Sequence, residues 1–323
     1  KDLKWVAEFK GRPVGDLSLA EQADIPDWLA DRLLAHRTPQ EVLALAQGLN
    51  QAAPLDLRVN PLKAEREAVL ARLAGEGIGA EAGRLSPLAI RLKAKPALQK
   101  HPLYLDGSIE VQDEGSQLLG YLLAPRRGEM AADFCAGAGG KTLLLGALMR
   151  STGRLYAFDV SDKRMARLKD RVARSGLSNV HPVTIANEND IRIKRLAGKI
   201  DRVLVDAPCS GLGTLRRNPD LKWRQTAEGV AELSRKQHDI LKGASRLVKA
   251  GGRLVYATCS ILPEENEAIV AGFLAAHADF RQVSAQDILA QQGIALDCGE
   301  TLRLAPHTHG TDGFYAAVLE RTG

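Results

Sequence analysis

The sequence predicts an α/β protein built mainly on a doubly wound parallel sheet, with one antiparallel strand near the carboxyl end. The main observation is that short apolar, strand-like runs alternate with helical patterns through residues 111–323, which is typical of a parallel sheet with helices on both faces. The second concerns residues 302–304 and 314–319, which resemble the two strands of a hairpin. A hairpin there adds an antiparallel strand to the sheet.

Two further regions precede this sheet. Residues 1–53 have the pattern of short helices, and residues 54–110 mix strand and helix patterns and are predicted to form a small α+β subdomain. The chain does not begin with Met, so we expect that it starts inside a longer gene product or follows processing. The elements predicted in these regions are a helix over 25–34, a helix from Pro39 to Leu49 with Thr38 as N-cap, strands over 55–59 and 89–93, and a helix over 61–73.

The main domain is predicted to extend over residues 111–323. Strands and helices alternate in it, and parallel strands joined by a crossover helix are usually neighbours in a sheet. The predicted helices cover residues 117–123, 142–149, 162–174, 231–248 and 264–277, and the predicted parallel strands cover 130–134, 154–158, 200–205 and 253–257.

Composition limits the class of protein. The chain has 323 residues and a formal net charge of +5, which is compatible with a polyanionic partner. Its four cysteines form no CxxC pair, which excludes a zinc ribbon and a thioredoxin motif and favours a cytoplasmic location. No apolar run is long enough to span a membrane, so no membrane association is expected. His307 and His309 lie in a predicted turn without further ligands, so no metal site is expected.

A glycine-rich turn over residues 133–142 (DFCAGAGGKT) joins the first strand of the main domain to its helix. Glycines let the backbone approach a ligand closely, and Asp159 ends the next strand, where a carboxylate can bind two ribose hydroxyls. A Walker A loop needs glycine where Cys135 stands, and a dinucleotide fingerprint needs a third glycine where Thr142 stands. The turn therefore fits S-adenosylmethionine, which has no pyrophosphate to bind.

Two cysteines end two apolar runs and begin polar turns. Cys209 follows residues 204–208 (LVDAP), Cys259 follows residues 254–258 (LVYAT), and each cysteine precedes a serine. A crossover helix between the two runs makes the strands parallel, which places both thiols at the carboxyl edge of the sheet, where ligands bind. A thiolate that adds to C6 of a pyrimidine makes C5 nucleophilic enough to accept a methyl group. The residues alone do not rank the two thiols, and free cysteines are also common as small buried hydrophobes.

Several longer motifs accompany these cysteines. They are DAPCSG at 206–211, GTLRRNPD at 213–220, YATCS at 256–260, PEEN at 263–266, QDEGS at 112–116, LRVN at 57–60 and IPDWL at 25–29. Together they closely resemble the motifs of the Sun/RsmB-type RNA 5-methylcytosine methyltransferases. The resemblance implies a Rossmann-like methyltransferase sheet and S-adenosylmethionine as the methyl donor.

The resemblance also assigns roles to residues. It implies that Cys259 attacks C6 and that Cys209 promotes product release, whereas DNA cytosine methyltransferases use the Pro-Cys cysteine as nucleophile. It implies that Lys141 and Asp206 lie beside the target base. Ala138 stands where proline is common in the family, a change that leaves the backbone donors of the turn intact. The residues implied to surround the methyl donor are Cys135, Ala136, Gly137, Ala138, Gly139, Gly140, Lys141, Asp159, Asp190 and Asp206.

RNA is the expected partner of a monomeric protein, with ribosomal RNA as the preferred substrate. The target is an unpaired or flipped cytosine, because a stacked base cannot reach a thiol. A tRNA substrate stays open, and a DNA cytosine methyltransferase and a non-catalytic RNA-binding protein are competing interpretations. The residues predicted to contact RNA are Arg216, Arg217, Lys222, Trp223 and Arg224 in the main domain, and Arg58, Arg91, Lys93, Lys95 and Lys100 in the small subdomain.

Overall fold

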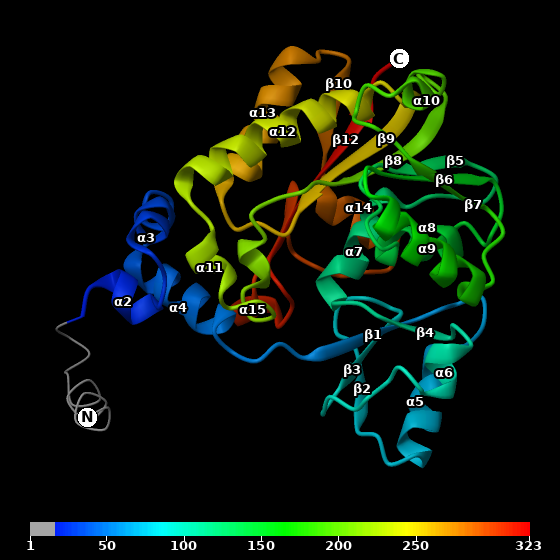
Figure 1. Ribbon diagram of the computed structural model, residues 1–323, viewed down its shortest axis with the longest axis horizontal. Helices are drawn as coiled ribbons and strands as arrows, with labels where there is room; N and C mark the ends of the chain where they lie inside the picture. The colour runs from blue at the N-terminus through cyan, green and yellow to red at the C-terminus, as the bar shows by residue number, and fades with distance from the viewer. Residues whose placement is uncertain (1–16) are drawn as a thin grey trace.

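A helix-covered mixed sheet forms the main body of the protein (Figure 1). The computed structural model describes residues 17–323, so the part of the predicted helical region over residues 1–16 lies outside the described residues. Within residues 17–323 this sheet has eight strands. They follow in the order β10 (Phe280–Val283), β12 (Phe314–Arg321), β9 (Val248–Thr258), β8 (Ile200–Asp206), β5 (Met130–Asp133), β6 (Arg154–Asp159) and β7 (Val180–Thr184), and β11 (Thr301–Leu304) pairs with β12.

The strand directions confirm the predicted fold class. Strands β9, β8, β5, β6 and β7 are parallel to one another, as the alternating pattern predicts. Strand β12 is antiparallel to β9, and β11 and β12 form the predicted antiparallel pair. The link between β11 and β12 contains a short helix, α15 (Pro306–His309).

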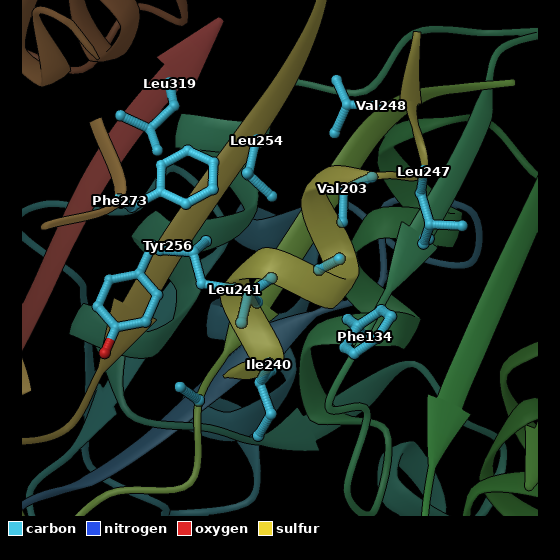
Figure 2. Close-up of a cluster of buried hydrophobic side chains, with 14 of the residues drawn as sticks. Phe134, Val203, Ile240, Leu241, Leu247, Val248, Leu254, Tyr256, Phe273 and Leu319 are labelled. Carbon is cyan, nitrogen blue, oxygen red and sulfur yellow. The ribbon is translucent and has the colours of Figure 1, made fainter. Parts of the chain in front are cut away.

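Helices cover both faces of the sheet, and side chains alternate between the faces. On β8, Val203 and Val205 belong to one buried cluster, whereas Leu204 belongs to the cluster on the opposite face. Figure 2 shows Ile240 and Leu241 on a helix that packs against Val203. The first face carries α10 (Ile191–Lys194), α12 (Ala227–Ser245) and α13 (Glu267–Ala276), and the second carries α7 (Glu114–Leu123), α8 (Gly140–Leu148), α9 (Asp162–Ser175) and α14 (Ala285–Gln291).

A smaller antiparallel sheet precedes the main one in the sequence and lies below it in Figure 1. Its strand order is β2 (Ala80–Ala82), β3 (Ala89–Leu92), β1 (Leu55–Val59) and β4 (Ile109–Val111), and it packs with helices α5 (Arg66–Gly75) and α6 (Pro102–Leu105). The helix predicted over residues 61–73 is α5, which begins later than predicted, at Arg66. The reason is a turn at Asn60, whose side-chain oxygen accepts a hydrogen bond from the Leu62 amide at 3.1 Å.

Within residues 17–323, three N-terminal helices pack against the loops that follow the two cysteines. They are α2 (Leu19–Ala23), α3 (Asp27–Leu34) and α4 (Pro39–Leu49), and Thr38 caps α4 as predicted. Their apolar residues share one buried cluster with Leu212, Leu215 and Ile261. The short helices in these loops are η2 (Leu212–Thr214), α11 (Leu221–Arg224) and η3 (Pro263–Glu265).

The sequence pattern misses some short elements. Strand β7 is one, because it lies at the edge of the sheet and is only partly buried, so His181 and Pro182 interrupt its apolar pattern. The helix predicted over residues 264–277 is divided into η3 and α13 at Asn266, which leaves the helical backbone conformation. Within residues 17–323, no helix combines the length and the apolar character needed to cross a membrane.

The core between α12 and the sheet gives a test of stability. Leu241 is fully buried there, so we expect Leu241→Ala to lower the free energy of unfolding by about 2–5 kcal/mol. The matched control is Leu105→Ala, because Leu105 is 58% exposed, and we expect it to change stability by no more than about 0.5 kcal/mol. Urea denaturation of both variants measures the difference, and equal losses would contradict this packing.

Candidate active site

A cavity of about 490 Å³ opens at the carboxyl ends of β5, β6, β8 and β9. Its volume is in the range of small-molecule sites, and the carboxyl edge of an open parallel sheet is where such sites occur. Cys135 and Gly137 after β5, Asp159 at the end of β6, and both Cys209 and Cys259 line the cavity. Candidate residues from four separate strand ends therefore meet at one place.

The turn after β5 depends on two glycines with positive φ. Gly139 has a φ of 89°, which strains any residue with a side chain, and a Cβ atom there would lie 2.1 Å from a methyl carbon of Leu168, which would have to move. Gly137 has a φ of 56°, and a Cβ atom there would meet nothing within 4 Å. Because Gly137 also lines the cavity, its bare backbone leaves space for a ligand to approach.

Asp159 ties this turn to the end of the next strand. Its carboxylate accepts hydrogen bonds from the backbone amides of Gly137 at 2.9 Å and Ser161 at 2.8 Å. It also forms an ion pair with Arg164 at 2.9 Å. The acidic group that the sequence predicts for ribose hydroxyls is therefore fixed at the cavity wall, with the glycine turn beside it.

Other residues of the turn hold it in shape. The Ala136 amide donates to the Phe158 carbonyl at 2.9 Å, and the Ala138 carbonyl accepts a hydrogen bond from Arg171 at 2.7 Å. Gly140 begins helix α8. These backbone contacts join the turn to β6 and α9, which flank it.

Asp190 stands outside the lining of the cavity. It caps the short helix α10, and its carboxylate accepts a hydrogen bond from the Ala186 amide at 2.9 Å and binds the Arg192 guanidinium. The hydrogen bond from Arg192 lowers the pKa of Asp190. The neighbouring Ala186 and Glu188 line the cavity instead, so Asp190 shapes the segment that does.

The two thiols lie side by side, with their sulfur atoms 3.4 Å apart. Strands β8 and β9 are parallel neighbours, with Asp206 opposite Ala257, which brings the two cysteine turns to the same edge as predicted. The hydrogen bond to Cys259, followed by burial, raises the pKa of Cys209 well above its usual value. Cys209 is therefore in the thiol form at neutral pH.

Lys141 and Asp206 form an ion pair beside these thiols, with Nζ 2.7 Å from a carboxylate oxygen. Burial by itself would lower the pKa of Lys141, but the charges of Asp206, Asp133 and Cys259 outweigh it and raise that pKa. Lys141 is therefore a fixed positive charge whose field reaches Cys259.

The structure corrects part of the predicted RNA contact in the main domain. Arg216 is 5% exposed and forms an ion pair with Asp312, and Lys222 is 3% exposed and binds Asp24. Arg217 likewise pairs with Asp312. The charges of Arg216 and Lys222 are neutralised inside the protein, so these two are not free to bind phosphates, whereas Arg217 keeps 31% of its side chain exposed. The members of this loop at the surface are Arg217, Trp223 and Arg224.

Arg58 was predicted to contact RNA, but its guanidinium is buried and points into the protein. It donates a 2.6 Å hydrogen bond to the Gly140 carbonyl at the start of α8 and another to the Gln112 side chain. Arg171, which binds Ala138, also pairs with Glu110 of β4 at 2.8 Å. The small subdomain thus supports the glycine turn from two directions, a contact that no local sequence pattern predicts.

Arg58 gives a test of this support. We expect Arg58→Met to lower the free energy of unfolding by about 1–3 kcal/mol, because the buried Gln112 side chain and the Gly140 carbonyl lose a donor. We also expect weaker binding of S-adenosylmethionine, measured by calorimetry. The control is Arg84→Met, since Arg84 is exposed in the same subdomain. Equal donor affinity in both variants would contradict a role for Arg58 in the turn.

Asp133 gives a test by pH. Burial raises the pKa of this carboxyl, at the end of β5, to about 7, although the Thr142 hydroxyl donates to it at 2.7 Å. A carboxyl with a raised pKa in the folded state favours folding below its unfolded pKa and loses that contribution as the pH rises through 7. We therefore expect wild-type stability to fall between pH 5 and pH 8, relative to Asp133→Asn, by about 1–4 kcal/mol.

Urea unfolding across this pH range measures the Asp133 effect. The asparagine variant is the matched reference, because its side-chain oxygen can still accept the hydrogen bond from Thr142. A stability difference that does not change with pH would show that Asp133 does not titrate in this range.

Comparison with known proteins places these features in a family. Residues 120–320 match the family described as 16S rRNA methyltransferase RsmB/F, and residues 25–99 match its ferredoxin-like domain. A probable ribosomal RNA small subunit methyltransferase B of Synechocystis sp. is 37% identical over 319 residues, which are 98% of this chain and 71% of that protein.

Solved structures agree with this match. PH0851 has a TM-score of 0.86 and 34% identity, covering 97% of this chain and 70% of that one. NSun6 from Pyrococcus horikoshii, solved with SFG, has a TM-score of 0.82 over 92% of this chain and 98% of that one, and at 19% identity it supports the fold alone. From the sequence match over both regions, the chain belongs to the RsmB/F family of S-adenosylmethionine-dependent 16S rRNA methyltransferases.

Proposed function

We propose that the protein methylates C5 of a cytosine in small-subunit ribosomal RNA through a covalent bond between Cys259 and C6 of the base. The observation that carries this proposal is the pair of thiols 3.4 Å apart at the wall of the cavity. The fixed Lys141–Asp206 ion pair supports it, because it supplies charges beside the reacting base. A fold without chemistry needs neither the second thiol nor the ion pair.

The residues around the cavity fit S-adenosylmethionine. Gly137 leaves open space at its backbone, and Asp159 presents a carboxylate whose oxygens have lone pairs left for ribose hydroxyls. Cys135 forms part of the same wall, and Asp190 orders the segment at Ala186 that closes it. When bound, the donor supplies an electrophilic methyl group.

The Cys259 thiolate begins the reaction by adding to C6, and the electron pair of the C5–C6 bond passes to C5, which then takes the methyl group. Asp206 accepts a hydrogen bond from the exocyclic amine of the base as charge develops, while Lys141 holds that carboxylate in place. The C5 proton then leaves to water, the C6–S bond breaks, and the aromatic ring is restored.

The charges around the two thiols support different roles for them in the reaction. The ammonium of Lys141 lies on the side of Cys259, and a positive charge beside a cysteine suits its use as the nucleophile. Cys209 keeps its proton because its pKa is raised by the hydrogen bond to Cys259 and by burial. Cys209 therefore donates that proton to the Cys259 sulfur as the C6–S bond breaks, which speeds release of the methylated base.

This division gives a test with two variants. We expect Cys259→Ala to lose methylation and to form no covalent complex with RNA. We expect Cys209→Ala to lose activity by about 10²–10⁴-fold because release loses its proton donor. Since the adduct forms but does not resolve, Cys209→Ala should accumulate a protein–RNA complex that survives denaturing gels.

Cys298→Ala is the matched control for the cysteine test, because Cys298 is also a partly buried free cysteine but does not line the cavity. The opposite pattern, with activity kept in Cys259→Ala and lost in Cys209→Ala, would reverse the assignment. Bisulfite sequencing of RNA from a strain that lacks the gene, with and without the restored protein, identifies the modified RNA and separates a ribosomal from a tRNA substrate. Cytoplasmic location and a monomeric state stay predictions.

A further inference from the structure

The two cysteine turns share one buried carboxylate. Each cysteine precedes a serine, and the hydroxyls of Ser210 and Ser260 both donate to the same side-chain oxygen, Oε2 of Glu265. The two hydroxyl oxygens lie 3.3 Å apart, close to the 3.4 Å that separates the two sulfur atoms. Glu265 is fully buried at the end of η3. One side chain therefore joins the turn after β8 to the turn after β9.

The other oxygen of Glu265 strengthens this link. Its Oε1 accepts hydrogen bonds from the Ser210 amide at 2.8 Å and from the Gln237 side chain at 2.9 Å. Gln237 also donates to the Pro208 carbonyl at 3.0 Å, so both sides of Cys209 are held. Within residues 17–323, Glu265 takes part in no ion pair, and its side chain is satisfied by donors of the two turns and of α12.

We propose that Glu265 is a positioning residue that fixes the separation of Cys209 and Cys259 for the covalent reaction. The proposal rests on the function proposed above for these thiols. A buried carboxylate is costly to desolvate, and well-packed apolar side chains often stabilise a protein as much. An apolar residue, however, has no acceptor for either serine, so it cannot link the two turns by hydrogen bonds.

The charge of Glu265 has a second effect on the pair. The pKa of Cys209 is raised first by the hydrogen bond to Cys259, then by burial, and further by the negative charges of Cys259 and Glu265. On the other side of the pair, the positive charge of Lys141 faces Cys259. Glu265 therefore sets the distance between the thiols and also helps to keep the proton on Cys209.

Thiol separation is measured without methylation by phenylarsine oxide, a trivalent arsenical that binds two neighbouring thiols and holds a single thiol only weakly. We expect the full chain to bind it, and Cys209→Ala and Cys259→Ala to lose tight binding. Glu265→Ala should weaken binding about tenfold or more, because the second thiol loses its high effective concentration. Glu265→Gln keeps an acceptor for the Ser210 amide and a polar partner for the hydroxyls, so it should recover most of the affinity.

The same variants are assayed for methylation of ribosomal RNA. For Glu265→Ala we expect kcat to fall by about 10–100-fold because the thiols are misplaced, while the affinity for S-adenosylmethionine stays within about twofold, since Glu265 does not line the cavity. Glu265→Gln should restore kcat in part. This change removes a negative charge near Cys209 and therefore lowers the pKa of that thiol. The loss of activity at alkaline pH should then begin at a lower pH than in the wild-type protein.

Glu114→Ala is the matched control for loss of a buried carboxylate. Glu114 is 2% exposed and accepts backbone hydrogen bonds from Leu85 and Ser86, far from the thiols in the sequence. The Glu114→Ala variant should be less stable than the wild-type protein but should bind phenylarsine oxide with unchanged affinity. If Glu265→Ala does not fold, Ser260→Ala removes one contact of the link and should weaken arsenical binding and kcat together.

Unchanged arsenical affinity in Glu265→Ala, or in Ser260→Ala if the former does not fold, would overturn the positioning role. So would a glutamine variant no better than the alanine variant. If the wild-type protein binds the arsenical through both thiols but methylates no RNA, the proposed function fails, and the arsenical series still decides the role of Glu265.

Discussion

The parallel pairing of β8 and β9 is the constraint on which the site depends. The register sets Val205 opposite Tyr256 and Asp206 opposite Ala257, so the backbone leaves β8 and β9 at the same level of the sheet. The pairing continues into the turns, where the Ala207 amide donates to the Ala257 carbonyl at 2.8 Å. A shift of one residue would turn every side chain of one strand to the other face and separate the thiols. The buried core beneath β8 and β9 therefore sets the positions of the two thiols as well as the stability of the fold.

The N-terminal helices and the small subdomain support the site, although both are distant from it in the sequence. The N-terminal helices pack against Leu212 and Ile261 in the loops beyond the cysteines. The small subdomain reaches the glycine turn through Arg58 and through the Glu110–Arg171 pair. Both regions thus contribute to the shape of the site without lining its cavity, and a change in either is coupled to the thiols or to the turn through direct contacts.

Most of the fold and the position of the candidate site could be predicted from local patterns. Apolar runs identified the central strands, and the ends of those runs located both cysteines at one edge. Buried charges could not be predicted in this way, since a charged residue in a local pattern indicates an exposed position. Lys222 is buried because Asp24, 198 residues away, binds it, and Glu265 because Ser210, 55 residues away, does. Such partners meet only in the folded chain.

The charges around the two chemically identical thiols differ, and this difference supports the division of roles proposed for them. Lys141 places a positive charge on the side of Cys259. Its Nζ is held in position by a carboxylate oxygen of Asp206, 2.7 Å away. Glu265 places a negative charge on the side of Cys209. The two sulfur atoms therefore differ in their electrostatic surroundings, although they lie only 3.4 Å apart. Sequence alone, which gives each cysteine a similar turn and a following serine, contains no such difference, so the distinction arises from packing.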